Sequence, residues 1–259
     1  MDSKRLRLVI ACALLLGAVA CGGNNPKEAP GALPGDQALF DDGTAAMKDE
    51  DWEKGRTLLQ QLVDAYPQSS LAPKARIAIA DSYFRQNDET NRAQATVEYQ
   101  AFISLYPFSE SAAYAQFQLG MLKFRQVRIA SRDQTETRDA LRLFEKVVSE
   151  YPGSEYVEPA RQKIAECRDR LAEHELLVAL FYLKAKSYDA ALPRLKRIVT
   201  DFPDFSRLDE VYYNIGDVLA RLGKNAEAIP YFQKVAESKP AGPLAAKANE
   251  RIRELGTPR

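Results

Sequence analysis

The chain has 259 residues, with 36 Lys and Arg against 36 Asp and Glu, and 46% of its residues are hydrophobic. A chain of this length and composition can bury a core, and its balanced charge excludes a general electrostatic attraction to nucleic acid. The chain has one His and three Cys, which excludes any site that needs two histidines or four cysteines. Three cysteines also cannot form several disulfides. Ala occurs 37 times while Gly and Pro stay near average usage, which favours an all-α fold.

Residues 1–20 have the pattern of a secretory signal. Lys4, Arg5 and Arg7 precede an uninterrupted apolar or small stretch at 8–20. Its thirteen residues are too few to cross a bilayer core about 30 Å thick. Small residues stand directly before Cys21, which resembles the lipobox of bacterial lipoproteins. We expect residues 1–20 to be a lipoprotein signal peptide and Cys21 to carry S-diacylglycerol and N-acyl chains; the alternative is a plain secretory signal with an incidental Cys.

Residues 21–35 are expected to form a flexible tether. Positions 22–35 contain four Gly and three Pro. Two or more acyl chains hold a protein firmly in a membrane. By the same resemblance, Asp after the lipidated Cys favours the inner membrane, and this chain has Gly22 there. Without residues 1–20 the chain keeps 33 basic and 35 acidic residues, so anionic lipid would not attract it. We therefore expect a lipid anchor in the cell outer membrane, on the side that faces the periplasm.

An aromatic-Pro pair recurs along the rest of the chain. The pairs are Tyr66-Pro67, Tyr106-Pro107, Tyr151-Pro152 and Phe202-Pro203, with Lys239-Pro240 as a degenerate fifth. The prolines are 40, 45, 51 and 37 residues apart, a range typical of solenoids. Each pair closes a run of apolar residues spaced by three or four, which predicts one buried face of an α-helix, and the proline predicts where that helix ends.

The last two units match the tetratricopeptide pattern at equal offsets. Their small residues, where paired helices must approach closely, are Ala179 and Ala191 in unit four, and Gly216 and Ala228 in unit five. We predict an all-α, right-handed α-solenoid of about five tetratricopeptide-like helix pairs, with a capping helix at about 244–255. We expect an N-terminal half at 36–128 that binds precursors and a C-terminal half at 129–259 that carries the scaffold contact. We expect about three extra residues in a turn near 87–90, a polar insertion at 129–136, and a helix lengthened through 158–173.

The chain resembles the ComL/YfiO family of outer-membrane assembly lipoproteins over nearly all of its mature length, most clearly at about 128–205. Besides the lipobox, tether and repeats, the resemblance is carried by SRDQ at 131–134, RDALRLF at 138–144, YPGSEY at 151–156 and RDRLAEHE at 168–175. The resemblance implies a protein under the outer membrane that binds the POTRA domains of the barrel-shaped BamA subunit, works with other Bam lipoproteins and receives unfolded β-barrel precursors.

The resemblance also implies residues that bind the partner. In the family, an Arg ten residues before the Asp of an aromatic-Pro-Asp sequence contacts an acidic residue of the last POTRA domain. Arg194 holds that place ahead of Asp204. We expect Arg194, together with Arg168 and Arg170, to bind the partner. Composition alone favours the alternative that Arg194 is a solvated helix residue.

The first helices of units one to three are expected to line a groove for precursors. An apolar floor with basic edges would suit the last segment of a barrel precursor, which alternates apolar and polar residues and ends in an aromatic residue with a free carboxylate. The alternative is that several of these side chains are interhelical core. The apolar set is Phe40, Met47, Ile77, Phe84, Tyr114, Phe117, Met121 and Phe124, and the basic set is Lys48, Lys74, Arg85 and Arg125.

No residue pattern indicates catalysis. The sequence has no Gly-rich phosphate loop, no paired metal-ligand spacing and no G-x-S-x-G elbow. His174, between Glu173 and Glu175, is expected to be solvated, and Cys167 has the spacing of a helix core residue. We predict a protein that is not an enzyme and has no metal or cofactor besides its lipid. The alternative function is another envelope repeat protein, for secretin or pilus assembly or for cell-envelope constriction.

Overall fold

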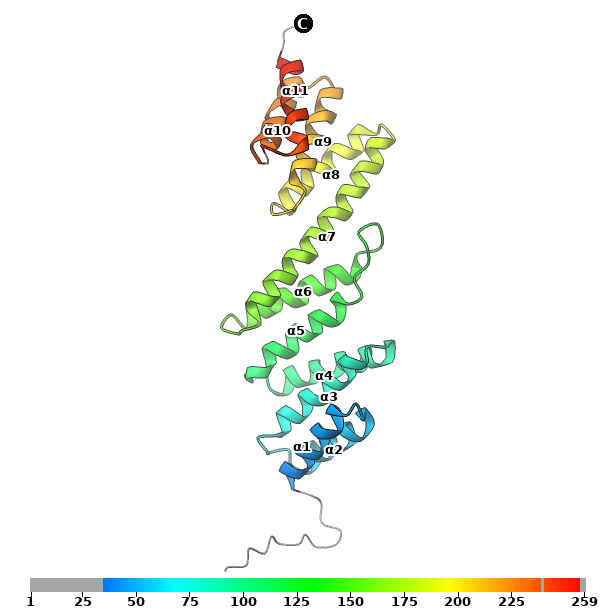
Figure 1. Cartoon of the computed structure of the whole chain (residues 1–259), viewed down its shortest axis with the longest axis vertical. Helices are drawn as coiled ribbons and strands as arrows, with labels where there is room; N and C mark the ends of the chain where they lie inside the picture. The colour runs from blue at the N-terminus through cyan, green and yellow to red at the C-terminus, as the bar shows by residue number, and fades with distance from the viewer. Residues whose placement is uncertain (1–34, 239, 257–259) are drawn as a thin grey trace, which may run out of the picture. The chain divides into compact units, whose positions relative to one another are not determined.

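The computed structural model describes residues 35–238 and 240–256, which form eleven α-helices and no β-strand (Figure 1). The expected signal peptide, Cys21 and nearly all of the expected tether lie outside these residues. The helices are α1 (Asp36–Lys48), α2 (Trp52–Ala65), α3 (Ala72–Gln86), α4 (Glu89–Leu105), α5 (Glu110–Phe124), α6 (Thr135–Glu150), α7 (Val157–Lys184), α8 (Tyr188–Asp201), α9 (Leu208–Arg221), α10 (Asn225–Ser238) and α11 (Pro243–Gly256).

The helices form five consecutive pairs followed by one terminal helix. Each helix packs against the next along the chain, from α1 and α2 to α10 and α11 (Figure 1). The terminal helix α11 covers α10 and also contacts α9. The predicted all-α fold of tetratricopeptide-like helix pairs with a capping helix is confirmed. No helix in the described part of the chain is both long enough and apolar enough to cross a membrane.

The aromatic-Pro pairs end the second helices of units one to four. The backbone N–H of Tyr66 still donates to the Leu62 carbonyl at 2.8 Å, and that of Phe202 to the Ile198 carbonyl at 2.9 Å. The four aromatic residues then take ψ values between 54° and 63°. The α region is disfavoured for a residue before proline, so the helix stops there. Because the same stop occurs at each aromatic-Pro pair, the turn after the second helix recurs from unit to unit.

Glycines allow the two helices of a unit to approach closely. A Cβ atom on Gly120 of α5 would lie 2.5 Å from the ring of Phe144 on α6. In unit five, a Cβ atom on Gly216 of α9 would lie 2.9 Å from the ring of Phe232 on α10. Both phenylalanines are fully buried. The first helix therefore leaves a flat patch that the aromatic ring of the second helix covers.

Helix α7 has 28 residues and contributes to two cores. Its first half places Ala160 and Cys167 against Phe144 of α6. Its second half places Leu176 and Ala179 in the core that α8 to α11 share. The predicted lengthening of this helix is confirmed, and residues 168–170 lie between its two packing regions.

Two turns differ from the prediction. Only Asn87 and Asp88 separate α3 from α4, so the extra residues near 87–90 extend the helices instead. Asn87 has a left-handed φ of 57°, and the Asp88 carboxylate accepts the Asn91 N–H, which closes the turn in two residues. The polar insertion also begins earlier than expected: residues 125–134 are non-helical, and Thr135 already starts α6.

Candidate partner-binding sites

The three arginines expected to bind a partner lie in three separate surroundings. Arg168 lies on α7 and lines a pocket with the turn between α8 and α9. Arg170, two residues farther along α7, lines a different depression with Phe124 and Val127. Arg194 lies on α8 and faces Glu175 of α7. The structure therefore does not bring them together into one cluster.

Arg194 is paired but still accessible. Its Nη1 atom lies 3.2 Å from Oε2 of Glu175, and its guanidinium carbon lies 5.5 Å from the centre of the Tyr182 ring. The Arg194 side chain is 40% exposed. A guanidinium has five N–H donors, and the contact with Glu175 uses one of them. The ring and the carboxylate fix its position while further donors remain for another acceptor.

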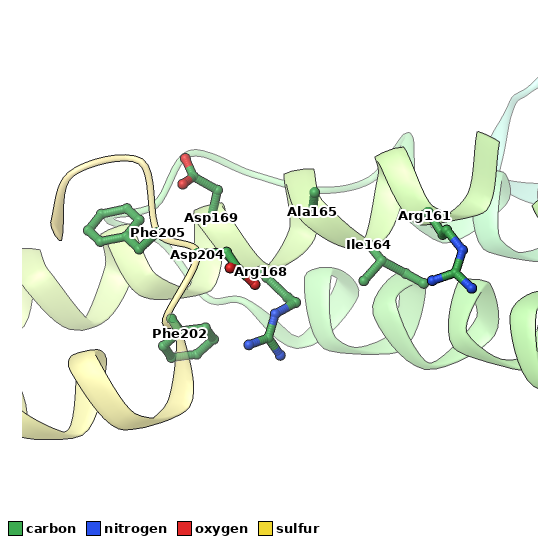
Figure 2. A pocket seen from close by; sticks show the side chains of 8 residues that line it. All are labelled: Arg161, Ile164, Ala165, Arg168, Asp169, Phe202, Asp204 and Phe205. Carbon is green, nitrogen blue, oxygen red and sulfur yellow. The ribbon is translucent and has the colours of Figure 1, made fainter. Parts of the chain in front are cut away.

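The pocket beside Arg168 lies between α7 and the turn that follows α8 (Figure 2). We call it the α7 pocket; it has a volume of about 250 Å³ and is lined by Arg161, Ile164, Ala165, Arg168, Asp169, Phe202, Asp204 and Phe205. Arg168 donates from Nη2 to the Asp201 carbonyl at 2.6 Å, and its guanidinium carbon lies 5.5 Å from the centre of the Phe202 ring. Arg168 therefore joins α7 to the end of α8.

His174 differs from its expected solvated position. It is half-buried, and its Nδ1 atom lies 2.6 Å from the carbonyl oxygen of Ala130. Because a carbonyl only accepts, Nδ1 carries the proton. Ala130 belongs to the polar insertion and is buried, so the insertion folds back onto α7. Nothing near His174 in the sequence indicates this contact, because its partner is 44 residues away.

Cys167 lies in the core, as its spacing in the sequence predicts. Its side chain is fully buried between α7 and α6. Burial, together with the charge of the nearby Glu166 carboxylate, raises the pKa of the Cys167 thiol to about 12. A thiol that stays protonated at neutral pH is a poor nucleophile, so Cys167 acts as a small apolar residue.

The apolar residues of the predicted groove are partly interhelical core. Met47 and Phe84 are only 7% and 9% exposed. The ring of Phe84 packs edge-on against Tyr99, with 6.4 Å between ring centres, and Arg125 covers its outer side with the guanidinium carbon 3.7 Å from the ring centre. The other six apolar residues are half-buried, and the four basic residues are exposed: Phe40, Ile77, Tyr114, Phe117, Met121 and Phe124, and Lys48, Lys74, Arg85 and Arg125.

A hollow of about 330 Å³ lies on this part of the surface, between α1, the start of α2 and α3. We call it the α3 hollow. The sequence predicted three of its lining residues, and five were missed. The predicted residues are Met47, Lys48 and Arg85, and the missed ones are Thr44, Trp52, Ala78, Asp81 and Ser82.

Asp81 is the missed residue with the most unusual environment. Its Oδ1 atom accepts hydrogen bonds from the hydroxyls of Tyr99, at 2.5 Å, and Tyr114, at 2.8 Å. Burial raises the pKa of Asp81, although both hydroxyls and the charge of Arg85 act in the opposite direction. Burial and the Asp81 charge also raise the pKa of both tyrosines. The sequence held one signal for this site. Asp81 lies four residues after Ile77 and three before Phe84, which places a carboxylate at helical spacing among apolar residues.

Comparisons with known proteins agree with the resemblance. The chain is 28% identical to the outer membrane protein assembly factor BamD of Caulobacter vibrioides over 231 residues, which cover 86% of this chain and 73% of the relative. It is 26% identical to the same factor of Vibrio cholerae, with 79% and 85% covered. Among solved structures, the chain is similar to the TPR2AB domain in the pHSP90 complex of yeast Sti1, at 12% identity, with 85% of this chain and 82% of that chain covered and a TM-score of 0.46.

A family model also matches most of the chain. The model is described as "YfiO: Outer membrane lipoprotein" and matches residues 35–229. This range includes Arg194, the α7 pocket and the α3 hollow. The chain therefore belongs to the YfiO family of outer membrane lipoproteins.

Proposed function

We propose that this chain is a non-catalytic outer membrane protein assembly factor, held by lipid on Cys21 at the periplasmic side of the outer membrane. The observation that carries the proposal is the family match over residues 35–229, together with relatives of that name that align with most of the chain. In this role the chain binds the POTRA domains of a BamA-like barrel protein, works with other Bam lipoproteins and receives unfolded barrel precursors.

Arg194 is the proposed contact with the POTRA domain. Its side chain is accessible and is positioned by Glu175 and Tyr182. A carboxylate on the partner would add a charge-assisted hydrogen bond to donors that Glu175 leaves free. Such a contact favours Arg over Lys, because the guanidinium can hold two carboxylates in its plane at once.

The α3 hollow is the proposed contact with precursors. The exposed Lys48 and Arg85 belong to its lining, and Met47 and Trp52 supply apolar surface. A terminal aromatic residue with a free carboxylate matches this combination of basic and apolar groups. The other apolar side chains of the predicted groove contribute mainly to packing between helices.

Co-purification tests the proposal. The full chain, tagged at its C-terminus, is purified in mild detergent from the envelope of its own host, and its partners are identified by mass spectrometry. Recovery of a POTRA-containing barrel protein supports the proposal. Recovery of a secretin, a pilus-assembly protein or a peptidoglycan-synthesis protein instead supports the alternative envelope function.

Cys21→Ser, which removes the proposed lipid attachment, should move the protein from the membrane to the soluble fraction.

A further inference from the structure

We propose that the groove between the α4–α5 turn and the α6–α7 turn, together with the exposed ring of Phe108 beside it, binds a basic segment of another protein. The two turns lie next to each other along one side of the helix array (Figure 1). We call this site the turn groove; its volume is about 460 Å³, and it is lined by Ser109, Glu110 and Ala113 and by residues 151–155. It includes neither Arg194 nor any residue of the α3 hollow, so the proposal goes beyond the function proposed above.

Phe108 is an aromatic residue that the repeat itself does not need. Its side chain is 100% exposed, and that of Leu105, at the end of α4, is 56% exposed. In the corresponding turns of units one and three, the residue between the proline and the serine is Gln68 and Gly153. A polar residue or a glycine therefore serves the turn equally well, and the ring of Phe108 adds nothing to the core. A large apolar surface that is fully in water and does not stabilise the fold indicates contact with another molecule.

The turn holds Phe108 in a fixed position. The backbone N–H of Ser109 donates to the Tyr106 carbonyl at 3.0 Å, and the serines of units one and three make the same bond in their turns. The Ser109 hydroxyl accepts the N–H of Ser111 at 3.2 Å, which caps α5. Because the turn is already ordered, a ligand that covers Phe108 has little ordering to impose on it.

The charges of the lining identify the occupant as basic. Glu110 and Glu155, one from each turn, are its only charged residues, and both are exposed. Neither side chain makes a hydrogen bond or an ion pair with any residue that the structure describes. No Lys or Arg lines this groove, whereas the α7 pocket and the α3 hollow each contain two basic residues. Two carboxylates without a basic partner are complementary to Lys or Arg.

The apolar part of the lining suits the stem of such a side chain. Ala113 is only 3% exposed, and Tyr151 is half-buried. Lys and Arg cover apolar surface with their methylene groups while the charged head stays in water. A basic side chain would thus lie in the turn groove with its head at the two glutamates. An apolar residue next to it would cover Phe108 and Leu105, as an anchor residue does in a protein interface.

The first test places a photo-cross-linker at position 108. p-Benzoylphenylalanine replaces Phe108 in the full chain, which is produced in its own host, and intact cells are irradiated. Mass spectrometry then identifies the cross-linked segment. We expect a segment of another protein with a net positive charge within four residues of the cross-linked position. A cross-link to phospholipid, to a second copy of this chain or to a segment without net positive charge, or no cross-link at all, would overturn the proposal.

The second test measures whether the two glutamates select this segment. A synthetic peptide of the captured segment is titrated with the detergent-solubilised full chain and followed by fluorescence anisotropy. Glu110→Lys combined with Glu155→Lys should weaken binding by at least about tenfold, because two attractions become two repulsions. Phe108→Ala should also weaken binding by about tenfold, because it removes the apolar contact. Binding that ignores either change would overturn the proposal.

A matched variant separates the turn groove from the overall charge of the chain. Glu237→Lys combined with Glu250→Lys changes the net charge equally, at exposed residues of α10 and α11 that do not line the groove, and should bind the peptide like the wild type. An equal loss in this variant would overturn the proposal. Arg194→Glu should leave peptide binding unchanged even if it abolishes POTRA binding, so the two proposals can fail separately. Circular dichroism melts establish that each variant is folded.

Discussion

Asp169 in the middle of α7 accepts hydrogen bonds from both the backbone N–H and the hydroxyl of Ser206, 37 residues later in the chain. This pair fixes the turn before α9 against α7 at the point where α7 passes from one core to the other. The polar string at 168–175, which carries the family resemblance, therefore has a structural role here in addition to any role in binding.

Replacing Asp169 should weaken this junction. Asp169→Ala removes the carboxylate that accepts the Ser206 N–H and hydroxyl, and we expect the free energy of unfolding to fall by about 1 kcal/mol, the net worth of a partly solvated hydrogen bond. Asp169→Asn keeps one acceptor oxygen and should lose less. Urea unfolding of the full chain measures both changes. An unchanged midpoint for Asp169→Ala would show that the turn is held by other contacts.

The close approach of α5 and α6 predicts a penalty for adding one methyl group. Gly120→Ala gains about 1 kcal/mol of helix propensity, but its Cβ atom would lie 2.5 Å from the fully buried ring of Phe144. Overpacking costs about 1–3 kcal/mol, so we expect a net loss of stability. Gly153→Ala is the control, since no atom lies within 4 Å of its added Cβ. The melting temperature should fall more in Gly120→Ala than in Gly153→Ala. Equal melting temperatures would contradict tight packing at Gly120.

The raised pKa of Asp81 predicts a pH-dependent stability. Folding holds this pKa above its ordinary value of 3.8, so the folded chain binds the proton more tightly than the unfolded one. Stability should therefore fall as the pH rises from 3.8 through the raised pKa. Asp81→Asn keeps an acceptor for Tyr99 and Tyr114 without a charge, and should lose this component of the pH dependence.

Asp81→Ala is the matched comparison. It leaves the two tyrosine hydroxyls without an acceptor at this position, and we expect it to be less stable than Asp81→Asn by about 1–3 kcal/mol at every pH. Urea unfolding between pH 3.5 and 8 separates the two effects. If the difference between wild type and Asp81→Asn appeared only as the pH fell, the sign of the pKa shift would be wrong.

The regular part of the fold could be predicted because its determinants are local. Apolar residues spaced by three and four act within one helix and recur in every unit, and an aromatic-Pro pair closes this run in units one to four. The two-residue turn at 87–88 was missed because a left-handed Asn87 ends α3 and the next residue, Asp88, already caps α4, so no longer loop is needed. The position of the capping helix was predicted to within one residue at each end.

The sites were less predictable because their residues meet across the chain. The register of the first helices pointed to Met47, Lys48 and Arg85, which do line one hollow. The same register could not show that Phe84 is covered by Arg125, or that Phe205, in the turn between α8 and α9, lines the α7 pocket. Contacts such as His174 with Ala130 depend on how a long insertion folds, which spacing does not encode.

The ion pair between Arg194 and Glu175 predicts that Glu175 helps the partner to bind. Glu175 holds the guanidinium in place and leaves further donors for the partner's carboxylate. Glu175→Gln keeps an acceptor but loses the charge, and should weaken binding to the POTRA domains by up to about fivefold, since a partly exposed ion pair is worth at most about 1 kcal/mol. Isothermal titration calorimetry measures the change. Tighter binding in Glu175→Gln would contradict the positioning role, because it would show that Glu175 competes with the partner for Arg194.

Binding of the Arg194→Glu variant to isolated POTRA domains of the cognate barrel protein tests the proposed function most directly. Arg197→Glu is the matched control, because Arg197 lies on the same helix, is 70% exposed and, among the residues that the structure describes, pairs only with Asp201 of its own helix. The account predicts that calorimetry shows a loss of roughly 2 kcal/mol or more for Arg194→Glu and less than about 1 kcal/mol for Arg197→Glu. Equal affinities of wild type and Arg194→Glu, or no binding by the wild type, would contradict it.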